Sequence, residues 1–315
     1  SGQIKQKTDP NQRVFQYTYD GLGRIVSEKQ PDISSPSSLV TKTSYIYTDI
    51  LNNVSVQKTD YLDANNSVNS YVYFDGLGRK IQEKKQAEAG QFTTKDYVYN
   101  NLGLLQKESL PYFSSGFART TPTATSGLFT NYSYDPLQRI STSTNALGVT
   151  TNTYNDWKLT VTDANGKTKD LFKDARGNLV QVDEHNLGDT YSTYYTYNYL
   201  GNLTKITDAL NNVRNFTFDG LGRRLTAEDL HATNDATFGA YSYTYDDMGD
   251  LWQVIDPNGN TVNYTYDSLN RQLLEKLGAT TKVTYTYDSG ADGIGRLTGT
   301  TTDELTQTNT YNALG

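Results

Sequence analysis

The sequence predicts an all-β protein built from tandem antiparallel β-hairpins. The 315 residues include 26 Tyr but only 10 Phe and 2 Trp, and tyrosine suits strands that are half buried and half wet. A short motif of the form Tyr-Thr-Tyr-Asp-x-Leu-Gly-Arg recurs along the chain. Apolar residues alternate over short runs, and no run of helix length has helical periodicity. We therefore expect one long, curved antiparallel sheet.

Composition excludes several other classes of protein. The formal charge is 28 minus 35, or −7, which argues against nucleic acid as a partner. No stretch approaches the roughly 20 apolar residues of a membrane span, so we expect no membrane insertion by this segment. Cysteine is absent, which excludes disulfides and thiolate metal sites. Low mean hydropathy alone would also fit disorder, but disordered chains are poor in aromatic residues.

The motif organises the whole chain, with near-matches at a period of 20–27 residues. Copies begin with YTYDGLGR at 17–24 and continue to YTYDSGADGIGR at 285–296 and a truncated TYNALG at 310–315, while degenerate copies lie near 45–49 and 153–157. We interpret the recurring residues as structural. They are Tyr17, Tyr19, Asp20, Gly23, Arg24, Tyr73, Asp75, Gly78, Arg79, Tyr99, Gly103, Tyr134, Asp135, Arg139, Gly177, Tyr197, Gly201, Phe218, Asp219, Gly222, Arg223, Tyr245, Asp246, Gly249, Tyr266, Asp267, Arg271, Tyr287, Asp288, Gly295 and Arg296.

Each copy is typical of a hairpin. Tyr17 and Tyr19 are two residues apart and so lie on one face of a strand. Asp20 can bond its own turn, and Gly23 supplies a left-handed residue that closes the loop. We expect positive φ at most of the motif glycines, and a different turn at Gln138, which replaces the glycine after Pro136. The apolar residue of the turn, such as Leu22, is expected to fold back and plug the end of the hairpin.

A return strand and a second turn complete each repeat. The second turns are visible at 162–167, 207–212 and 255–260, and longer loops are expected near 31–38 and 111–127. We interpret residues 1–315 as a single repeat array and a fragment of a larger protein. About eleven hairpins give roughly 22 strands, more than the about ten that open sheets usually hold, so the sheet must wind. A β-propeller is the alternative, but the uneven period argues against it.

No catalytic residue, cofactor site or metal site is predicted. His185 and His231 lie in turn-like segments with no nucleophile motif nearby, so both are interpreted as surface loop residues. The Asp163-Ala164-Asn165-Gly166 segment resembles half of a calcium loop but lacks the further acidic ligands, which favours a plain Asx turn. The six motif arginines are expected to form exposed ion pairs with turn carboxylates, each worth about 0–1 kcal/mol.

The repeated YDxxGR motif resembles the YD repeats of bacterial Rhs proteins, of the B and C components of Tc toxin complexes, and of teneurins. The resemblance covers essentially the whole chain, and the segment Leu110-Pro111-Tyr112-Phe113 is similar to larger toxin-complex members. It implies a sheet that spirals into a hollow shell of hairpins around a cargo polypeptide. It also implies a secreted or cell-surface, bacterial protein. The self-cleavage signature of Rhs-type shells is not matched by Asp256-Pro257-Asn258-Gly259-Asn260, which we interpret as a turn.

These observations favour a non-enzymatic structural segment whose partners are the rest of the parent polypeptide and an enclosed cargo domain. The alternative is a glycan-binding or adhesive surface module, because rows of tyrosine can stack on sugars. Cross-strand packing of the tyrosines is the interpretation we prefer. The final copy, from Asn309, has a first strand and a turn without a return strand. It is expected to fray or to pair only with the hairpin at 285–298.

Overall fold

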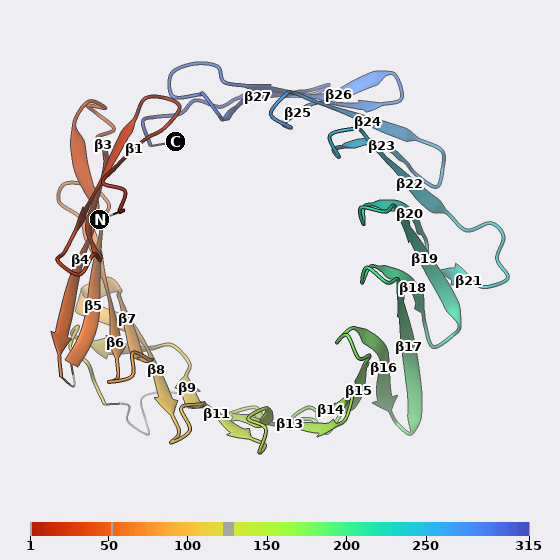
Figure 1. Ribbon diagram of the computed structural model, residues 1–315, viewed down its shortest axis with the longest axis horizontal. Coiled ribbons are helices and arrows are strands. Elements are labelled where there is room, and N and C mark those ends of the chain that lie inside the picture. The colour runs from red at the N-terminus through yellow and green to blue at the C-terminus, as the bar shows by residue number, and fades with distance from the viewer. Residues whose placement is uncertain (1, 52, 122–128, 315) are drawn as a thin grey trace. The chain divides into compact units, whose positions relative to one another are not determined.

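The computed structural model describes residues 2–51, 53–121 and 129–314 (Figure 1). Within these residues it contains 28 β-strands, one short 3₁₀ helix and no α-helix. Every strand pairing is antiparallel, and most join neighbours in sequence. The all-β array of hairpins is thus confirmed. The strand number exceeds the expected 22 because the degenerate copies near 45–49 and 153–157 also form hairpins and because four short strands, Gln6–Thr8, Tyr112–Ser115, His231–Ala232 and Thr306–Thr308, lie outside the motif hairpins. Residues 309–314 of the last copy form no strand.

The chain divides into two compact units, Ser1–Thr150 with Tyr311–Gly315, and Thr151–Thr310. Whether they act as one repeat array stays a prediction. Residues 122–127 of the loop expected at 111–127 lie outside the described residues, as do Ser1 and Gly315.

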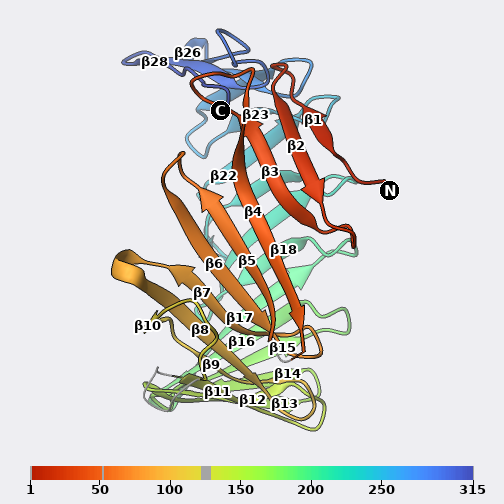
Figure 2. The same ribbon diagram turned by 90° about the vertical axis from the view of Figure 1, so that its left-hand side faces the viewer.

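The first unit is a ladder of strands that lie side by side with a progressive twist (Figure 2). It contains β1 (Gln6–Thr8), β2 (Val14–Tyr19), β3 (Ile25–Pro31), β4 (Leu39–Ile50), β5 (Asn53–Tyr61), β6 (Ser67–Phe74), β7 (Lys80–Gln86), the 3₁₀ helix η1 (Glu88–Gly90), β8 (Gln91–Tyr99), β9 (Leu105–Ser109), β10 (Tyr112–Ser115), β11 (Phe129–Tyr134) and β12 (Ile140–Asn145). Strand β8 pairs with β7 on one side, and with both β9 and β10 on the other.

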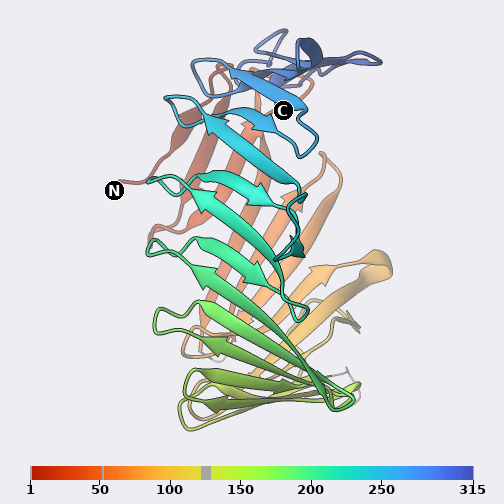
Figure 3. The same ribbon diagram turned by 90° about the vertical axis from the view of Figure 1, so that its right-hand side faces the viewer.

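The second unit repeats the same hairpin pattern, with turns at two opposite margins (Figure 3). Its strands are β14 (Lys158–Thr162), β15 (Thr168–Lys173), β16 (Leu179–Asn186), β17 (Asp189–Tyr197), β18 (Leu203–Thr207), β19 (Asn212–Phe218), β20 (Arg224–Glu228), β21 (His231–Ala232), β22 (Ala240–Tyr245), β23 (Leu251–Ile255), β24 (Thr261–Tyr266), β25 (Gln272–Leu277), β26 (Thr280–Tyr287), β27 (Leu297–Thr302) and β28 (Thr306–Thr308). Strand β13 (Gly148–Asn155) contains the division between the units.

The apolar interior is thin, as the composition predicts. Among the described residues, six hydrophobic side chains are buried, and they are Tyr73, Phe92, Val213, Phe216, Ala227 and Ala313. The largest fully buried side chains are instead mostly polar, and four of these six, Gln82, Lys84, Thr94 and Asp96, lie on strands β7 and β8 of the first unit. A sheet with so little aliphatic core must gain stability from cross-strand contacts and hydrogen bonds.

Candidate functional site: the repeat turn and its junction with the next hairpin

The motif turn is held by its first aspartate, as Asp20 shows. The backbone N–H of Asp20 donates to the carbonyl of Arg24 at 2.9 Å, and that of Gly23 donates to the carbonyl of Asp20 at 3.0 Å. One carboxylate oxygen of Asp20 accepts the N–H groups of Leu22 and Arg24, both at 2.9 Å. The register shifts by one residue between Thr18 and Tyr19, so the turn is a hairpin loop with a bulge. The same bonds recur at Asp75, Asp135, Asp219 and Asp267.

The glycine of the turn adopts the left-handed conformation, which confirms that prediction. All seven glycines for which it was made have positive φ, between 75° and 92°, and they are Gly23, Gly78, Gly103, Gly177, Gly201, Gly222 and Gly249. The expectation of a different turn at Gln138 is wrong. Gln138 has φ 64° and donates to the carbonyl of Asp135 as the glycines do. Pro136 is compatible with this turn because its fixed φ suits the residue after the aspartate.

An arginine closes the turn through the second oxygen of the same carboxylate. Arg24 Nε lies 2.7 Å from Asp20 Oδ2, and equivalent pairs occur at Arg79, Arg139, Arg223 and Arg271. These pairs are half-buried rather than exposed, which corrects the expectation. The Arg24 backbone N–H and guanidinium hold the pKa of the Asp20 carboxyl below its usual value. The carboxylate therefore remains ionised at neutral pH and bonds both the turn backbone and the guanidinium.

The same arginines reach the following repeat. The guanidinium of Arg24 lies over the ring of Tyr47 at 4.1 Å, and four such stacks recur at 4.1–4.7 Å. They join Arg24 to Tyr47, Arg79 to Tyr99, Arg223 to Tyr245 and Arg271 to Tyr287. Cation–π contacts at partly exposed sites contribute about 0.5–1 kcal/mol each.

In most copies the second tyrosine of the motif bonds to the backbone of the preceding repeat, and we call this bond the tyrosine latch. Tyr47 Oη donates to the carbonyl of Ile25, the residue that follows Arg24, at 2.9 Å. Further latches at 2.7–2.9 Å use Tyr99 on Lys80, Tyr134 on Leu105, Tyr197 on Leu179, Tyr245 on Arg224, Tyr266 on Leu251 and Tyr287 on Gln272. Each latch fixes one hairpin to its neighbour.

Two arginines also form an ion pair with an aspartate of the next repeat. Arg24 donates two bonds of 3.0 and 2.9 Å to Asp49, and Arg271 donates two bonds of 3.0 and 2.6 Å to Asp288. The guanidinium of Arg271, with the N–H of Gly295, lowers the pKa of Asp288 to about 2. These fork-shaped contacts are specific to the arginine guanidinium.

In the first unit, the hydroxyl of the first tyrosine of the motif donates to a glutamate side chain and not to a backbone carbonyl. Tyr45, Tyr97 and Tyr132 donate to Glu28, Glu83 and Glu108 on a neighbouring strand at 2.7–3.0 Å. Burial, followed by the bond to Glu28, raises the pKa of Tyr45 to about 12. The tyrosines thus hold neighbouring hairpins together, as the packing interpretation expects.

The copy at 71–79 has an unusual register. Phe74 pairs with Lys80 directly before the turn, so Phe74, not Tyr73, occupies the position that Tyr19 has in its own hairpin. Tyr73 consequently faces the other side of the sheet, where its hydroxyl donates to the carbonyl of Phe117. The reason is the extra residue in YVYFDGLGR, which changes the face of every residue before it.

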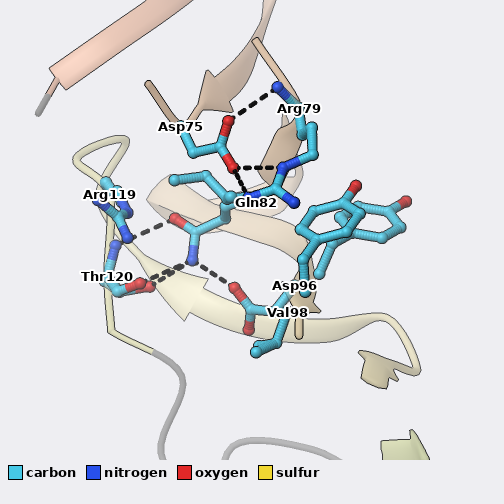
Figure 4. Close-up of a pocket in the computed structure, with 10 residues that line it drawn as sticks. Asp75, Arg79, Gln82, Asp96, Val98, Arg119 and Thr120 are labelled. Carbon is cyan, nitrogen blue, oxygen red and sulfur yellow. Dashed lines mark hydrogen bonds and ion pairs between the residues drawn. The ribbon is translucent and has the colours of Figure 1, made fainter. Parts of the chain in front are cut away.

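Residues 110–121, which we call the strap, cross this face of β6, β7 and β8 and cover a polar cluster (Figure 4). Gln82 donates to Asp96 at 2.6 Å and to the carbonyl of Thr120 at 2.9 Å, and it accepts the N–H of Thr120 at 3.0 Å. Tyr112 donates to the other oxygen of Asp96 at 2.6 Å. Gln82 and Asp96 are fully buried and bond to each other and to the strap. The cluster therefore holds the strap.

Lys84 lies beside this cluster and also bonds to the strap. Its Nζ donates to Ser114 and to the carbonyl of Gly116, both at 3.2 Å. Burial lowers the pKa of Lys84, and the charge of Asp96 opposes that shift. A cavity of about 240 Å³ adjoins the strap and is lined by Asp75, Arg79, Gln82 and Arg119 among others. Sequence reasoning missed this polar cluster entirely.

The two histidines do not lie in surface loops, which corrects the prediction. His185 belongs to β16 and lies 3.4 Å from Asp170, which also bonds Lys158 and Thr160. His231 belongs to β21, and its side chain is buried beside Glu228. Strand pairing places each histidine beside a carboxylate, and the local sequence does not show which strands pair.

The segment that resembles half of a calcium loop and the segment compared with the self-cleavage signature both form turns. Asp163 accepts the N–H groups of Asn165 and Lys167, both at 2.9 Å, as an Asx turn does. Asp256 accepts those of Asn258 and Asn260, both at 2.8 Å. Within the described residues there is no group of three or more His, Cys, Asp or Glu side chains placed to hold a metal ion. The same residues contain no helix that is long and apolar enough to span a membrane.

The apolar residue of the turn does not plug the hairpin, contrary to our expectation. Leu22 is 77% exposed and Leu77 is 79% exposed. The N–H of this residue bonds the turn aspartate, so its side chain projects away from the sheet. The Asp, Gly and Arg of the motif thus close the turn without this apolar side chain.

Comparisons with known proteins agree with this geometry. The Teneurin YD-shell family model matches residues 152–292, and the RHS Repeat model matches residues 1–32. The fold is similar to a crystal structure of TcdB2-TccC3-TEV and to one of TcdB2-TccC3 without hypervariable C-terminal region, each with TM-score 0.73 and 14% identity. A structure of the Photorhabdus luminescens Tc holotoxin pore gives TM-score 0.74 and 14% identity.

Each of these three matches covers 94% of this chain and 21% of the matched chain. No curated protein matches the sequence. The structural matches have low sequence identity and so concern the fold. The resemblance predicted from the sequence is confirmed: residues 152–292 match the teneurin YD-shell model, residues 1–32 match the RHS repeat model, and the fold is similar to that of the TcdB2-TccC3 structures.

Proposed function

We propose that the chain is a non-enzymatic wall segment of a β-shell that encloses a cargo polypeptide. The observation that carries the proposal is the tyrosine latch, because seven repeats use a tyrosine hydroxyl to bind the repeat before them. The repeat-defining residues, from Tyr17 to Arg296, would then be structural throughout. Residues 1–315 would act as a single array within a larger secreted or surface protein of bacterial origin. Its partners would be the rest of that polypeptide and the cargo.

A closed wall has one face toward the cargo and one toward solvent, and this difference can be tested. Thr244 pairs with Gln253 across β22 and β23, so Thr244 and Trp252 lie on opposite faces of the sheet. Both side chains are exposed in this chain. The chain has no cysteine, so Thr244→Cys and Trp252→Cys each introduce a single reactive group in this segment.

The experiment labels each variant of the full-length protein with a bulky polyethylene-glycol maleimide. We expect one position to react and the other to be shielded, with photo-crosslinks from the shielded position to a segment outside the repeats. Equal labelling of both positions in the intact protein would overturn the enclosing role. The isolated 315-residue chain is the control, in which both positions should react.

Glycan binding is a second candidate, supported by exposed aromatic rings in the second unit. Tyr199 is 77% exposed, and Trp252 is 47% exposed. A glycan array tests it, with Tyr199→Ala as the variant and Leu210→Ala as the control. Specific binding that only the tyrosine variant loses would favour the glycan-binding module over the wall segment.

A further inference from the structure

The side-chain amide of Gln82 on β7 is held against the hydroxyl group of Thr120 in the strap (Figure 4). Gln82 Nε2 donates to Thr120 Oγ1 at 3.1 Å and to the Thr120 carbonyl at 2.9 Å, while the Thr120 N–H donates to Gln82 Oε1 at 3.0 Å. Three bonds from one residue therefore fix both heteroatoms of the amide. A carboxamide is an acyl donor and an alcohol is an acyl acceptor, so the pair has the composition of an acyl-transfer site.

Water is largely excluded from this amide. Gln82 is 1% exposed, and Asp96, which bonds it, is 0% exposed. In a dry site hydrolysis is suppressed, and charges and dipoles act more strongly on one another. Well-oriented groups that are held together also react as if one were present at an effective concentration of about 10⁵ M or more. Burial and proximity thus favour transfer to the hydroxyl over transfer to water.

Two further groups are placed to assist acyl transfer. The Thr120 N–H donates to Gln82 Oε1, the oxygen on which negative charge develops when an alcohol adds to the amide. Asp96 Oδ1 lies 2.6 Å from Gln82 Nε2, the nitrogen that would leave, and Tyr112 orients the carboxylate through its other oxygen. A carboxylate in this position can deliver a proton to the leaving nitrogen.

A second glutamine–threonine contact on the same sheet lacks these features. Gln57 Nε2 donates to Thr59 Oγ1 at 3.4 Å, but the same nitrogen also bonds the amide oxygen of Asn69, where Gln82 bonds a carboxylate. Gln57 and Thr59 are both only half-buried. The contact under the strap is therefore distinguished by its burial and by Asp96.

We propose that Thr120 and Gln82 form an intramolecular ester that fastens the strap to β7. Thr120 Oγ1 attacks Gln82 Cδ, the Cδ–Nε2 bond breaks, and its electron pair leaves with the nitrogen. The hydroxyl proton passes through Asp96 to that nitrogen, so the products are the ester and one molecule of ammonia. No oxidant and no second reactant is consumed. The bond joins residues 38 positions apart in the sequence and does not depend on the enclosing role proposed above.

Mass spectrometry of tryptic peptides from the intact protein tests the proposal. Gln82 lies in the tryptic peptide 81–84, and Thr120 lies in the peptide 120–139. After incubation of the folded protein at neutral pH, we expect a branched species with the summed mass of the two peptides less one ammonia. Hydroxylamine, which cleaves esters, should separate them. If both peptides are recovered only as separate, unmodified species, the proposal is wrong.

The contact of Gln57 with Thr59 is an internal control in the same digest. These two residues lie in the tryptic peptides 43–58 and 59–79, which should remain separate. A branched species of these two peptides at equal yield would show that any glutamine–threonine contact reacts, and the role assigned to burial and Asp96 would be rejected.

Substitutions identify the reacting groups. Thr120→Ala removes the nucleophile but keeps the backbone bonds to Gln82, so the branched peptide should disappear. Thr120→Ser should retain it, as should Thr121→Ala, a change at the exposed neighbouring residue. Asp96→Asn should slow its formation by about a hundredfold or more. A branched peptide that persists in Thr120→Ala would exclude Thr120 as the nucleophile, and an unchanged rate in Asp96→Asn would exclude Asp96 as the proton carrier.

Discussion

The sheet under the strap in the first unit and the uncovered hairpins of the second unit are stabilised by different contacts. Under the strap, the polar side chains of Gln82 and Asp96 are fully buried and bonded. In the hairpins from β22 to β26, no strap covers the sheet, and half-exposed tyrosines latch each hairpin to the last. The difference teaches that the repeat itself supplies contacts between neighbours, whereas deep burial on this sheet depends on an inserted segment.

The largest loss of stability is expected for a substitution under the strap. Asp96→Ala would remove the carboxylate to which Tyr112 and Gln82 donate in a buried site, which costs about 3 kcal/mol. Native-state hydrogen exchange should show faster exchange in β8 and β10. Asp247→Ala, at an exposed position of a bare hairpin turn, is the control and should change little. Equal protection in both variants would mean that the strap adds no local stability.

The next largest loss of stability is expected in the motif turn, which occurs in both units. Gly78 has φ 75°, and open space surrounds the position of an added Cβ, so Gly78→Ala tests backbone strain alone. We expect a loss of about 1–2 kcal/mol in the free energy of local unfolding. Gly76, in the same turn, also has open space but no positive φ. Gly76→Ala should be neutral or slightly stabilising in the same hydrogen-exchange measurement.

A smaller effect is expected from a single latch. Tyr287→Phe removes the bond to the carbonyl of Gln272 but keeps the ring beneath Arg271. We expect a loss of about 1 kcal/mol, seen as faster exchange in β25 and β26. Tyr285→Phe, on the same face of the same strand, is the matched control. If both variants exchange alike, the latch hydroxyl does not join the repeats.

The smallest effect is a pH dependence at the Arg271–Asp288 pair. The pKa of Asp288 is depressed to about 2, so its contribution is present above the ordinary value of 3.8 and is lost as pH falls through about 2. Arg271→Met should return the pKa toward 3.8, which an NMR titration of the Asp288 carboxyl would measure. An unchanged pKa in the variant would assign the shift to the Gly295 N–H, which also bonds this carboxylate.

Much of the repeat could be predicted because its turns are local. Asp20 and Gly23 determine the hairpin through bonds within five residues, so the sequence pattern identifies it. The exposure of Leu22 could not be predicted, because burial depends on what packs against the turn. The error at Gln138 has a related cause, since the aspartate network tolerates a strained residue where the glycine is absent.

The strap and the histidine contacts depend on pairings between segments distant in sequence. The pairing of β10 with β8 returns the chain across a sheet that has already formed, and no local pattern encodes it. The sequence did contain one indication of the covered strand. Strand β7 reads KIQEKKQ and is polar at nearly every position, yet Gln82 and Lys84 are fully buried. A polar strand followed by a long Pro- and Ser-containing segment indicates that the segment could cover it.

In the tyrosine latch the hydroxyl donates its hydrogen bond to a backbone carbonyl, and this has a consequence for how such arrays change over time. The acceptor residues include Ile25, Lys80, Leu105, Arg224 and Gln272, which share no side-chain chemistry. For this bond, a repeat therefore needs no particular side chain in its neighbour. Units can be duplicated, deleted or exchanged with the junction preserved, so the length of the wall can be altered by recombination while the joints stay the same.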